Sequence, residues 1–222
     1  MATWNELFER GDGIARFPER EVQEFVSLLE RKFSERPLRV WDLCCGAGRH
    51  TVAISERGHT VFASDASECG VELTEKGLTK LGLSARTAVA DMTECPWTDV
   101  AFHGVVSWDS LHHNTLENIL TALDVVHERL EAGGLLLATM KSTRADWFGK
   151  GTEIEPGTFA HDSGPEAGVP HHYFDEAGIR SALAAWELVS LVELRCDYAE
   201  RPNGGPGMNP FRYTAWGVLA EK

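Results

Sequence analysis

The sequence has 222 residues, a length typical of one domain, and its apolar share of 43% is enough for a hydrophobic core. A formal net charge of −13 and the absence of any Lys/Arg run disfavour DNA or RNA as the main partner. No apolar run reaches the ~18 residues of a membrane span, and no basic-then-apolar leader opens the chain. The five cysteines lack the C-x-x-C spacing of metal sites. We therefore expect a cytoplasmic protein with reduced thiols and no membrane contact, either a monomer or a homodimer.

The first 36 residues are expected to be helical. A short helix is predicted over Thr3–Arg10, which the sequence Gly11-Asp12-Gly13 ends. Apolar residues recur at i, i+3, i+4 and i+7 in Glu19–Phe33, which predicts an amphipathic helix. Pro37 follows this helix and separates it from the first strand.

From residue 38 the pattern alternates between strands and helices. This alternation predicts an α/β fold in which a doubly wound, parallel sheet carries helices on both faces. Asn114 and Glu117 are spaced as a capping box for the helix that follows the fourth strand. The predicted strands are Arg39–Leu43, Thr60–Ser64, Ala85–Ala90, Gly104–Trp108 and Leu135–Met140, and the predicted helices are Arg49–Arg57, Ser67–Leu81 and Asn114–Leu130.

The last third of the chain departs from this pattern. Ser142–Pro170 is long and polar without a clear period, which is typical of a lid or binding loop. A helix is predicted from Asp175, a good N-cap residue, to about Trp186. The two β-like runs Glu187–Tyr198 and Phe211–Ala220 have no helix between them, so we expect them to pair antiparallel.

The stretch Val40–Thr51, V-W-D-L-C-C-G-A-G-R-H-T, is a strand, a glycine turn and a helix start. Such a unit directs backbone N–H groups and a helix N-terminus at a ligand. A P-loop would need a Lys in G-x-x-x-x-G-K-[ST], and none is present. A dinucleotide site of the form G-x-G-x-x-G would need a third glycine where Thr51 stands.

A third interpretation accounts for the turn better. Asp42-Leu43-Cys44-Cys45-Gly46-Ala47-Gly48 resembles the first motif of class I S-adenosylmethionine-dependent methyltransferases, [D/E]-x-G-x-G-x-G, with Cys44 in place of the first glycine. Asp65 ends the second strand 17 residues beyond Gly48, where a carboxylate can accept hydrogen bonds from both ribose hydroxyls. Further matches stand at the ends of strands three and four, where open α/β sheets bind ligands.

The resemblance implies S-adenosylmethionine as the cofactor. By resemblance, Asp42 holds the methionine amino end, Asp91 receives the adenine N6 group with Met92 lining the ring, and the end of the fourth strand lies beside the methionine moiety. The implied cofactor-binding residues are Asp42, Cys44, Gly46, Ala47, Gly48, Asp65, Ala66, Asp91, Met92, Ser107 and Trp108.

The resemblance also implies a fold over the whole chain. It is a single methyltransferase domain, 1–222, built on a seven-stranded, mostly parallel sheet whose antiparallel last strand inserts beside the fifth. In such enzymes the N-terminal helices and the loop after strand five diversify for the substrate. Residues 1–36 are therefore expected to form an N-terminal helical lid, and residues 142–174 a substrate-side loop insertion.

The implied reaction is an in-line transfer of a methyl group to an O, N, S or C nucleophile of a small molecule. A protonated acceptor needs a general base, for which His is the usual residue. The catalytic candidates are His112, His113, His171 and His172. Substrate candidates are Trp4, Phe8, Arg16, Phe17, Asp109 and Tyr173.

The sequence supports a metal site and other functions less well. The two His pairs could converge with Asp109, but no recognised ligand spacing is present, so no metal site is predicted. No N-P-P-Y motif follows strand four, which disfavours methylation of nucleic-acid bases or glutamine. Three alternatives remain: a cyclisation or similar reaction that uses the sulfonium, a non-catalytic module that binds the cofactor, and NAD(P)-dependent reduction.

Overall fold

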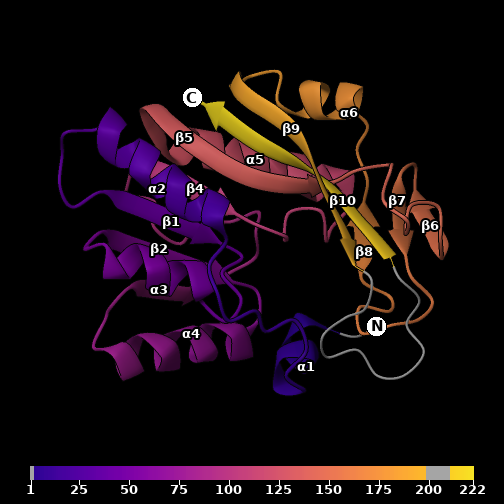
Figure 1. Cartoon of the computed structure of the whole chain (residues 1–222), viewed down its shortest axis with the longest axis horizontal. Helices are drawn as coiled ribbons and strands as arrows, with labels where there is room; N and C mark the ends of the chain where they lie inside the picture. The colour runs from indigo at the N-terminus through magenta and orange to yellow at the C-terminus, as the bar shows by residue number, and fades with distance from the viewer. Residues whose placement is uncertain (1–2, 199–210) are drawn as a thin grey trace.

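A seven-stranded sheet forms the centre of the computed structural model, which describes residues 3–198 and 211–222 (Figure 1). Its strand order is β3-β2-β1-β4-β5-β10-β9, and β10 runs antiparallel to both of its neighbours. The predicted doubly wound, mostly parallel sheet with an antiparallel last strand beside the fifth is thus confirmed. The strands are β1 Arg39–Leu43, β2 Thr60–Asp65, β3 Arg86–Val89, β4 Phe102–Ser107, β5 Leu130–Lys141, β9 Glu187–Tyr198 and β10 Phe211–Glu221.

Helices cover both faces of this sheet because its central strands are apolar on both sides. Val40 packs with the buried face of α2 and with Ile54 of α3, whereas its neighbour Trp41 packs into a second core formed with α5 and α6. Successive strand residues point to opposite faces, so one continuous apolar run serves two cores. The helices are α1 Trp4–Glu9, α2 Arg20–Lys32, α3 Arg49–Glu56, α4 Glu68–Leu81, α5 Leu116–Arg129 and α6 Glu176–Ala182.

The N-terminal segment is helical, as predicted, and α1 is docked against α4 (Figure 1). Thr3 and Glu6 form a reciprocal capping box that begins α1. The Oδ1 atom of Asn5 accepts hydrogen bonds from the Ser67 hydroxyl and the Cys69 amide, which lie at the start of α4. These bonds fix α1 beside the carboxyl ends of β1 and β2.

The segment between β5 and α6 is more regular than expected. It contains a three-stranded antiparallel sheet, β6 Thr152–Glu155, β7 Thr158–Ala160 and β8 Pro170–His172. The sequence over Ser142–Pro170 does not predict these strands, and the expected lid or binding role of the segment stays a prediction. Strands of three or four residues are too short to show a two-residue period, and the residues of β6 are mostly exposed.

The predicted capping box of the fifth helix is also wrong. α5 begins at Leu116 after Thr115, and the Thr115 side chain makes no capping bond. The Leu116 amide instead donates to the Glu155 carboxylate at 2.6 Å, so a side chain from β6 caps the helix. Sequence spacing identifies only caps supplied by neighbouring residues, and this partner lies 39 residues away.

The other departures concern element ends. β5 begins at Leu130 rather than Leu135, and α6 ends at Ala182 rather than near Trp186. Among the described residues, no helix is both long enough and apolar enough to cross a membrane. All five cysteines are free thiols, as predicted.

Candidate cofactor and substrate site

The glycine turn after β1 has three residues in the left-handed region. Cys44 has a φ of 60°, Gly46 of 54° and Gly48 of 81°. A Cβ atom at Gly48 would lie 2.6 Å from the Thr74 hydroxyl oxygen, so glycine is required there for space as well as for conformation. Gly48 also precedes α3 as its N-cap and supplies no side-chain oxygen, which leaves the first-turn amides of α3 without a side-chain cap.

Asp65 joins the end of β2 to this turn. One carboxylate oxygen accepts from the Gly46 amide and the other from the Ser67 amide, both at 2.8 Å. Burial raises the pKa of Asp65, although both backbone bonds oppose that shift. Each carboxylate oxygen keeps a further lone pair, so the predicted contact with ribose hydroxyls is compatible with these bonds.

Asp42 lies at the other side of the turn, inside β1, and is only 2% exposed. It accepts a 2.5 Å hydrogen bond from the Thr51 hydroxyl. Burial raises the pKa of Asp42 to about 6, against the effect of Thr51, and the charge of Asp65 adds to the rise. A cationic ligand group beside Asp42 would offset the cost of burying its charge.

The ends of β3 and β4 hold four further predicted cofactor residues, Asp91, Met92, Ser107 and Trp108. Asp91 is exposed, and one of its oxygens accepts from the backbone and the hydroxyl of Thr93. Buried Met92 has its sulfur 3.2 Å from the Asn114 amide nitrogen. The Ser107 hydroxyl lies within hydrogen-bond distance of the Leu43 carbonyl and so ties β4 to β1 just before the turn. Trp108 packs against the α2 side of the sheet.

The last two predicted cofactor residues follow β1 and β2. Ala47, in the glycine turn, is half-buried, and Ala66, directly after β2, is exposed.

Two of the predicted substrate residues form an aromatic wall that leads away from the turn. A Cβ atom at Gly46 would lie 3.2 Å from the Phe8 ring, so α1 covers the turn directly. The rings of Phe8 and Trp4 are 6.0 Å apart, and Trp4 contacts the His113 ring edge-on at 4.7 Å. The glycine turn and the first His pair are thus connected through two aromatic side chains of α1.

The other substrate candidates lie in different surroundings. Asp109 has a φ of 55° and accepts a hydrogen bond from the Tyr213 hydroxyl, and its second oxygen is 3.8 Å from Arg49. Tyr173 is buried, and its hydroxyl lies 3.0 Å from Nε2 of His161. Arg16 and Phe17 are exposed on the connection between α1 and α2, Phe17 by 82%, so their substrate role stays a prediction.

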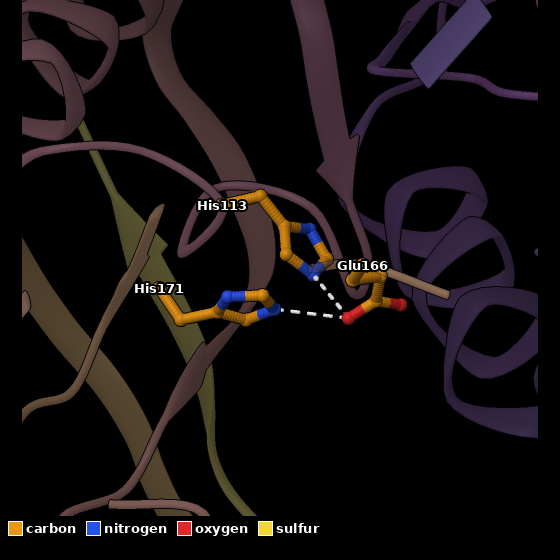
Figure 2. Close-up of side chains that lie close together, drawn as sticks. All are labelled: His113, Glu166 and His171. Carbon is orange, nitrogen blue, oxygen red and sulfur yellow. Dashed lines mark hydrogen bonds and ion pairs between the residues drawn. The ribbon is translucent and has the colours of Figure 1, made fainter. Parts of the chain in front are cut away.

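Three of the four predicted catalytic histidines come together. His112 and His113, after β4, have ring centroids 4.0 Å apart, and His171 of β8 lies 4.7 Å from the His113 ring. Nε2 of His171 is 2.9 Å from Glu166, and His113 is 3.8 Å from the same carboxylate oxygen (Figure 2). His172 points elsewhere, with its Nδ1 atom 2.7 Å from the Thr158 hydroxyl.

Two residues of this cluster were not predicted as site residues. Glu166 lies on the connection between β7 and β8, and His161 stacks on His171 at 4.5 Å. Neither residue stands at a recognised ligand or catalytic spacing from the other histidines. The sequence shows only that Glu166 is an acidic residue five positions before the pair His171-His172.

The pKa values in this cluster argue against a histidine that acts alone as general base. Burial lowers the pKa of His113 to about 3 and that of His112 well below its usual value. Burial raises the pKa of Glu166, but the bond to His171 and the nearby positive charges outweigh it and bring that pKa to about 2. At neutral pH Glu166 is therefore an ionised carboxylate near the neutral rings of His112 and His113. A ring with a pKa near 3 is a weak proton acceptor at pH 7.

Comparison with known proteins gives a consistent family. Residues 40–134 match the family model of a methyltransferase domain. An uncharacterized methyltransferase of Synechocystis sp. is 28% identical over 129 residues, which cover 54% of this chain and 58% of that protein. The trans-aconitate 2-methyltransferase of Rhodococcus jostii is 35% identical over 111 residues, covering 48% and 42%. The chain thus spans about half the length of the curated relatives it matches.

Solved structures share the fold at low sequence identity. TehB of Haemophilus influenzae superposes with a TM-score of 0.69 at 17% identity, covering 99% of this chain and 67% of that one. The 1,6-didemethyltoxoflavin-N1-methyltransferase of Burkholderia thailandensis, crystallised with its substrate and S-adenosylhomocysteine, has a TM-score of 0.64 at 21% identity, covering 92% and 79%. The methyltransferase-domain match over 40–134 and the shared fold agree with the resemblance of the strand-end residues to class I S-adenosylmethionine-dependent methyltransferases.

Proposed function

We propose that this chain transfers a methyl group from S-adenosylmethionine to a small-molecule acceptor. The observation that carries the proposal is the turn after β1, in which left-handed Gly46 and Gly48 stand between the buried carboxylates of Asp42 and Asp65. These carboxylates accept hydrogen bonds, which suits a ligand with an ammonium group and a ribose. The turn has no Lys that would bind a phosphate.

The residues present fit the cofactor. The side-chain-free positions of the turn let a ligand lie against the backbone, and in that arrangement Asp42 would face its amino end and Asp65 its ribose. When bound, the cofactor supplies a methyl group already activated by the sulfonium, which passes to the acceptor by in-line displacement. The protein's own task is to align the acceptor and exclude water, an effect that can lower the barrier by roughly 7–11 kcal/mol.

A small acceptor is supported by what surrounds the turn. α1 covers it with Phe8 and Trp4, and the β6–β8 sheet brings His171 and Glu166 to the far side of Trp4. In the Burkholderia enzyme of the same fold, the bound substrate is the small molecule didemethyltoxoflavin. A formal charge of −13 argues against a nucleic-acid acceptor, as the sequence predicted.

Binding of S-adenosylhomocysteine to an Asp65→Ala variant tests the cofactor assignment. Hydrogen bonds to a charged group contribute about 1.5–3 kcal/mol, so the dissociation constant measured by titration calorimetry should rise by about 10- to 150-fold. Asp124→Ala, a change at an exposed position of α5, should leave it unchanged. Equal affinities in wild type and Asp65→Ala would refute the assignment, as would a wild-type protein that does not bind. Release of S-adenosylhomocysteine on turnover separates methyl transfer from other sulfonium chemistry.

A further inference from the structure

Three potential metal ligands from separate segments converge beside the aromatic wall. His113 follows β4, Glu166 lies between β7 and β8, and His171 belongs to β8 (Figure 2). One ligand atom from each residue lies within 4.8 Å of the other two. His113 and His171 have almost no exposed side-chain surface, 10% and 1%, whereas Glu166 is 42% exposed. The cluster is therefore held by the fold and is accessible to solvent on one side.

The spacing of the ligand atoms suits a small divalent ion. Zinc binds imidazole nitrogen and carboxylate oxygen at about 2.0–2.2 Å, which places two tetrahedral ligands about 3.3 Å apart. The Glu166 oxygen lies 2.9 Å from Nε2 of His171 and 3.8 Å from Nε2 of His113. These two distances bracket the expected separation, and the ligand atoms of the two histidines lie within 4.8 Å of each other, so the three side chains can approach one ion by local shifts.

The hydrogen bonds of His171 hold its ring in a fixed orientation. Its Nδ1 atom donates to the Val169 carbonyl at 2.9 Å, because a carbonyl can only accept. Its Nε2 atom is thereby directed at the Glu166 carboxylate, 2.9 Å away. A backbone carbonyl that fixes the ring in this way is the usual companion of a metal-bound histidine.

His112 lies beside the cluster with incomplete hydrogen bonding. It is 1% exposed, and neither ring nitrogen has a hydrogen bond of ordinary geometry to a described residue, although the Thr139 backbone interacts with the ring. Its ring centroid lies 4.0 Å from that of His113 and 6.1 Å from that of His171. Buried imidazoles are normally hydrogen-bonded, and water or a ligand on a nearby ion would complete the bonding of this ring.

A second cluster, with one histidine and two carboxylates, does not share these features. Glu35, His103 and Glu131 also lie within ligand distance of one another. The Arg39 guanidinium, however, forms ion pairs with both of these carboxylates and already supplies the positive charge between them. This cluster is a surface ion-pair network and serves as an internal control.

We propose that His113, His171 and Glu166 bind a divalent transition-metal ion of the zinc class. Two imidazoles and one carboxylate favour such an ion over magnesium or calcium, which prefer sets of oxygen ligands. Three protein ligands leave a coordination position open, as in catalytic rather than structural zinc sites. This assignment revises the expectation from the sequence that no metal site is present.

The place of the ion identifies the class of acceptor, a step that rests on the proposed methyl transfer. Contacts of Trp4 with His113, of Trp4 with Phe8 and of Phe8 with the turn link the site to the glycine turn. An open position there would hold an acceptor through an oxygen atom, either a hydroxyl or a carboxylate. An ion there would activate the acceptor by polarising that oxygen atom.

Metal binding is testable without any substrate. The purified full chain, stripped with a chelator, is titrated with Zn²⁺ in competition with a chromophoric chelator, and separately with Co²⁺ while visible absorption is recorded. We expect one tightly bound Zn²⁺ per chain and the intense Co²⁺ bands of a four- or five-coordinate site. Loss of even an outer hydrogen-bond partner costs about 10- to 100-fold in metal affinity, so Glu166→Gln and His171→Ala should each lose at least 100-fold.

Matched variants make the result decisive. Glu35→Gln alters the Arg39 network and should keep full Zn²⁺ affinity. Because Glu166 is partly exposed, Glu166→Gln should fold normally, which its thermal unfolding curve checks. Failure of the wild type to bind Zn²⁺ overturns the proposal, as does unchanged affinity in both Glu166→Gln and His171→Ala. Binding of S-adenosylhomocysteine to the metal-free protein is measured in parallel, so failure of the cofactor assignment shows separately.

Discussion

Cys44 occupies the position where the related motif has its first glycine, and its backbone has the φ of 60° that glycine adopts readily. For an L-residue the left-handed region costs roughly 1–2 kcal/mol. Its neighbour Cys45 is buried, whereas Cys44 is half-buried, and Cys45 is not in that region. Burial raises the pKa of both thiols well above the usual value, so both are packing residues rather than nucleophiles.

Replacing each cysteine with glycine should distinguish the strained backbone of Cys44 from the unstrained backbone of Cys45. Both changes remove a thiol and add the same chain entropy to the unfolded state, but only Cys44→Gly relieves the left-handed strain. We expect Cys45→Gly to be more destabilising than Cys44→Gly by about 1–2 kcal/mol, as measured by urea unfolding. Equal losses of stability in the two variants would show that the backbone of Cys44 is not strained.

At the residue scale, the sequence predicts what lies at strand ends better than what lies on loops. Asp42 and Asp65 could be placed because parallel strands bring their carboxyl ends to one edge of the sheet. Glu166 could not, because its contact with His113 depends on how a 9-residue connection between β7 and β8 folds back. His171 and His172 are adjacent in sequence, yet strand geometry sends them to opposite sides, and only the structure shows which side faces the cluster.

At the element scale, α5 and the small sheet are coupled through Glu155. Its Oε1 atom accepts from the Leu116 amide at 2.6 Å and from the Thr158 hydroxyl at 2.8 Å. A carboxylate at a helix N-terminus satisfies a free N–H group and interacts favourably with the helix dipole. α5 follows the connection that carries His112 and His113, so this cap also helps to hold that connection.

Removing this cap should lower stability measurably. Loss of an N-cap side chain costs about 0.5–2 kcal/mol, so Glu155→Ala should reduce the free energy of unfolding by about that amount. Glu117→Ala removes the residue that sequence spacing places in a capping box, and it should cost only a few tenths of a kcal/mol. Unfolding of both variants in urea tests this, and a larger effect at Glu117 would favour the sequence-derived cap over the observed one.

The alternating elements were predictable because each carries its own signal. Val22, Phe25 and Leu29 repeat on one face of α2, and Gly82 ends α4 in the left-handed conformation. The β6–β8 sheet carries no such signal, because its strands are stabilised by their pairing and by contacts such as that of His172 with Thr158. Elements of this kind are specified by tertiary context, which local periodicity does not record.

At the scale of the whole molecule, one edge of the sheet collects acidic groups that the fold keeps from solvent. Asp42 is 2% exposed and Asp65 8% exposed, and no basic side chain of the described residues forms a hydrogen bond with either. The ligand-free protein therefore carries an electrostatic cost at the place where a cationic cofactor is proposed to bind. Function and stability are opposed at this edge, as is common where binding sites desolvate charge.

That cost should appear in the pH dependence of folding. Burial raises the pKa of Asp42 from 3.8 to about 6, so the folded protein holds a proton that the unfolded chain releases at lower pH. As pH rises from about 4 to about 6, the unfolded state is favoured, and a shift of about two pKa units corresponds to roughly 3 kcal/mol. The stabilising contribution is therefore present at pH 4 and lost above pH 6.

The variant Asp42→Asn isolates this effect because asparagine does not titrate yet can still accept from the Thr51 hydroxyl. Between pH 4 and pH 7 the free energy of unfolding of Asp42→Asn should gain roughly 3 kcal/mol relative to wild type. Asp124→Asn, at an exposed position of α5, should show no such pH-dependent difference. Urea unfolding of the three proteins at both pH values provides the measurement. If the wild type and Asp42→Asn differ in free energy of unfolding by the same amount at pH 4 and pH 7, Asp42 is not desolvated in solution. A cofactor ammonium group would then have no buried charge at Asp42 to offset.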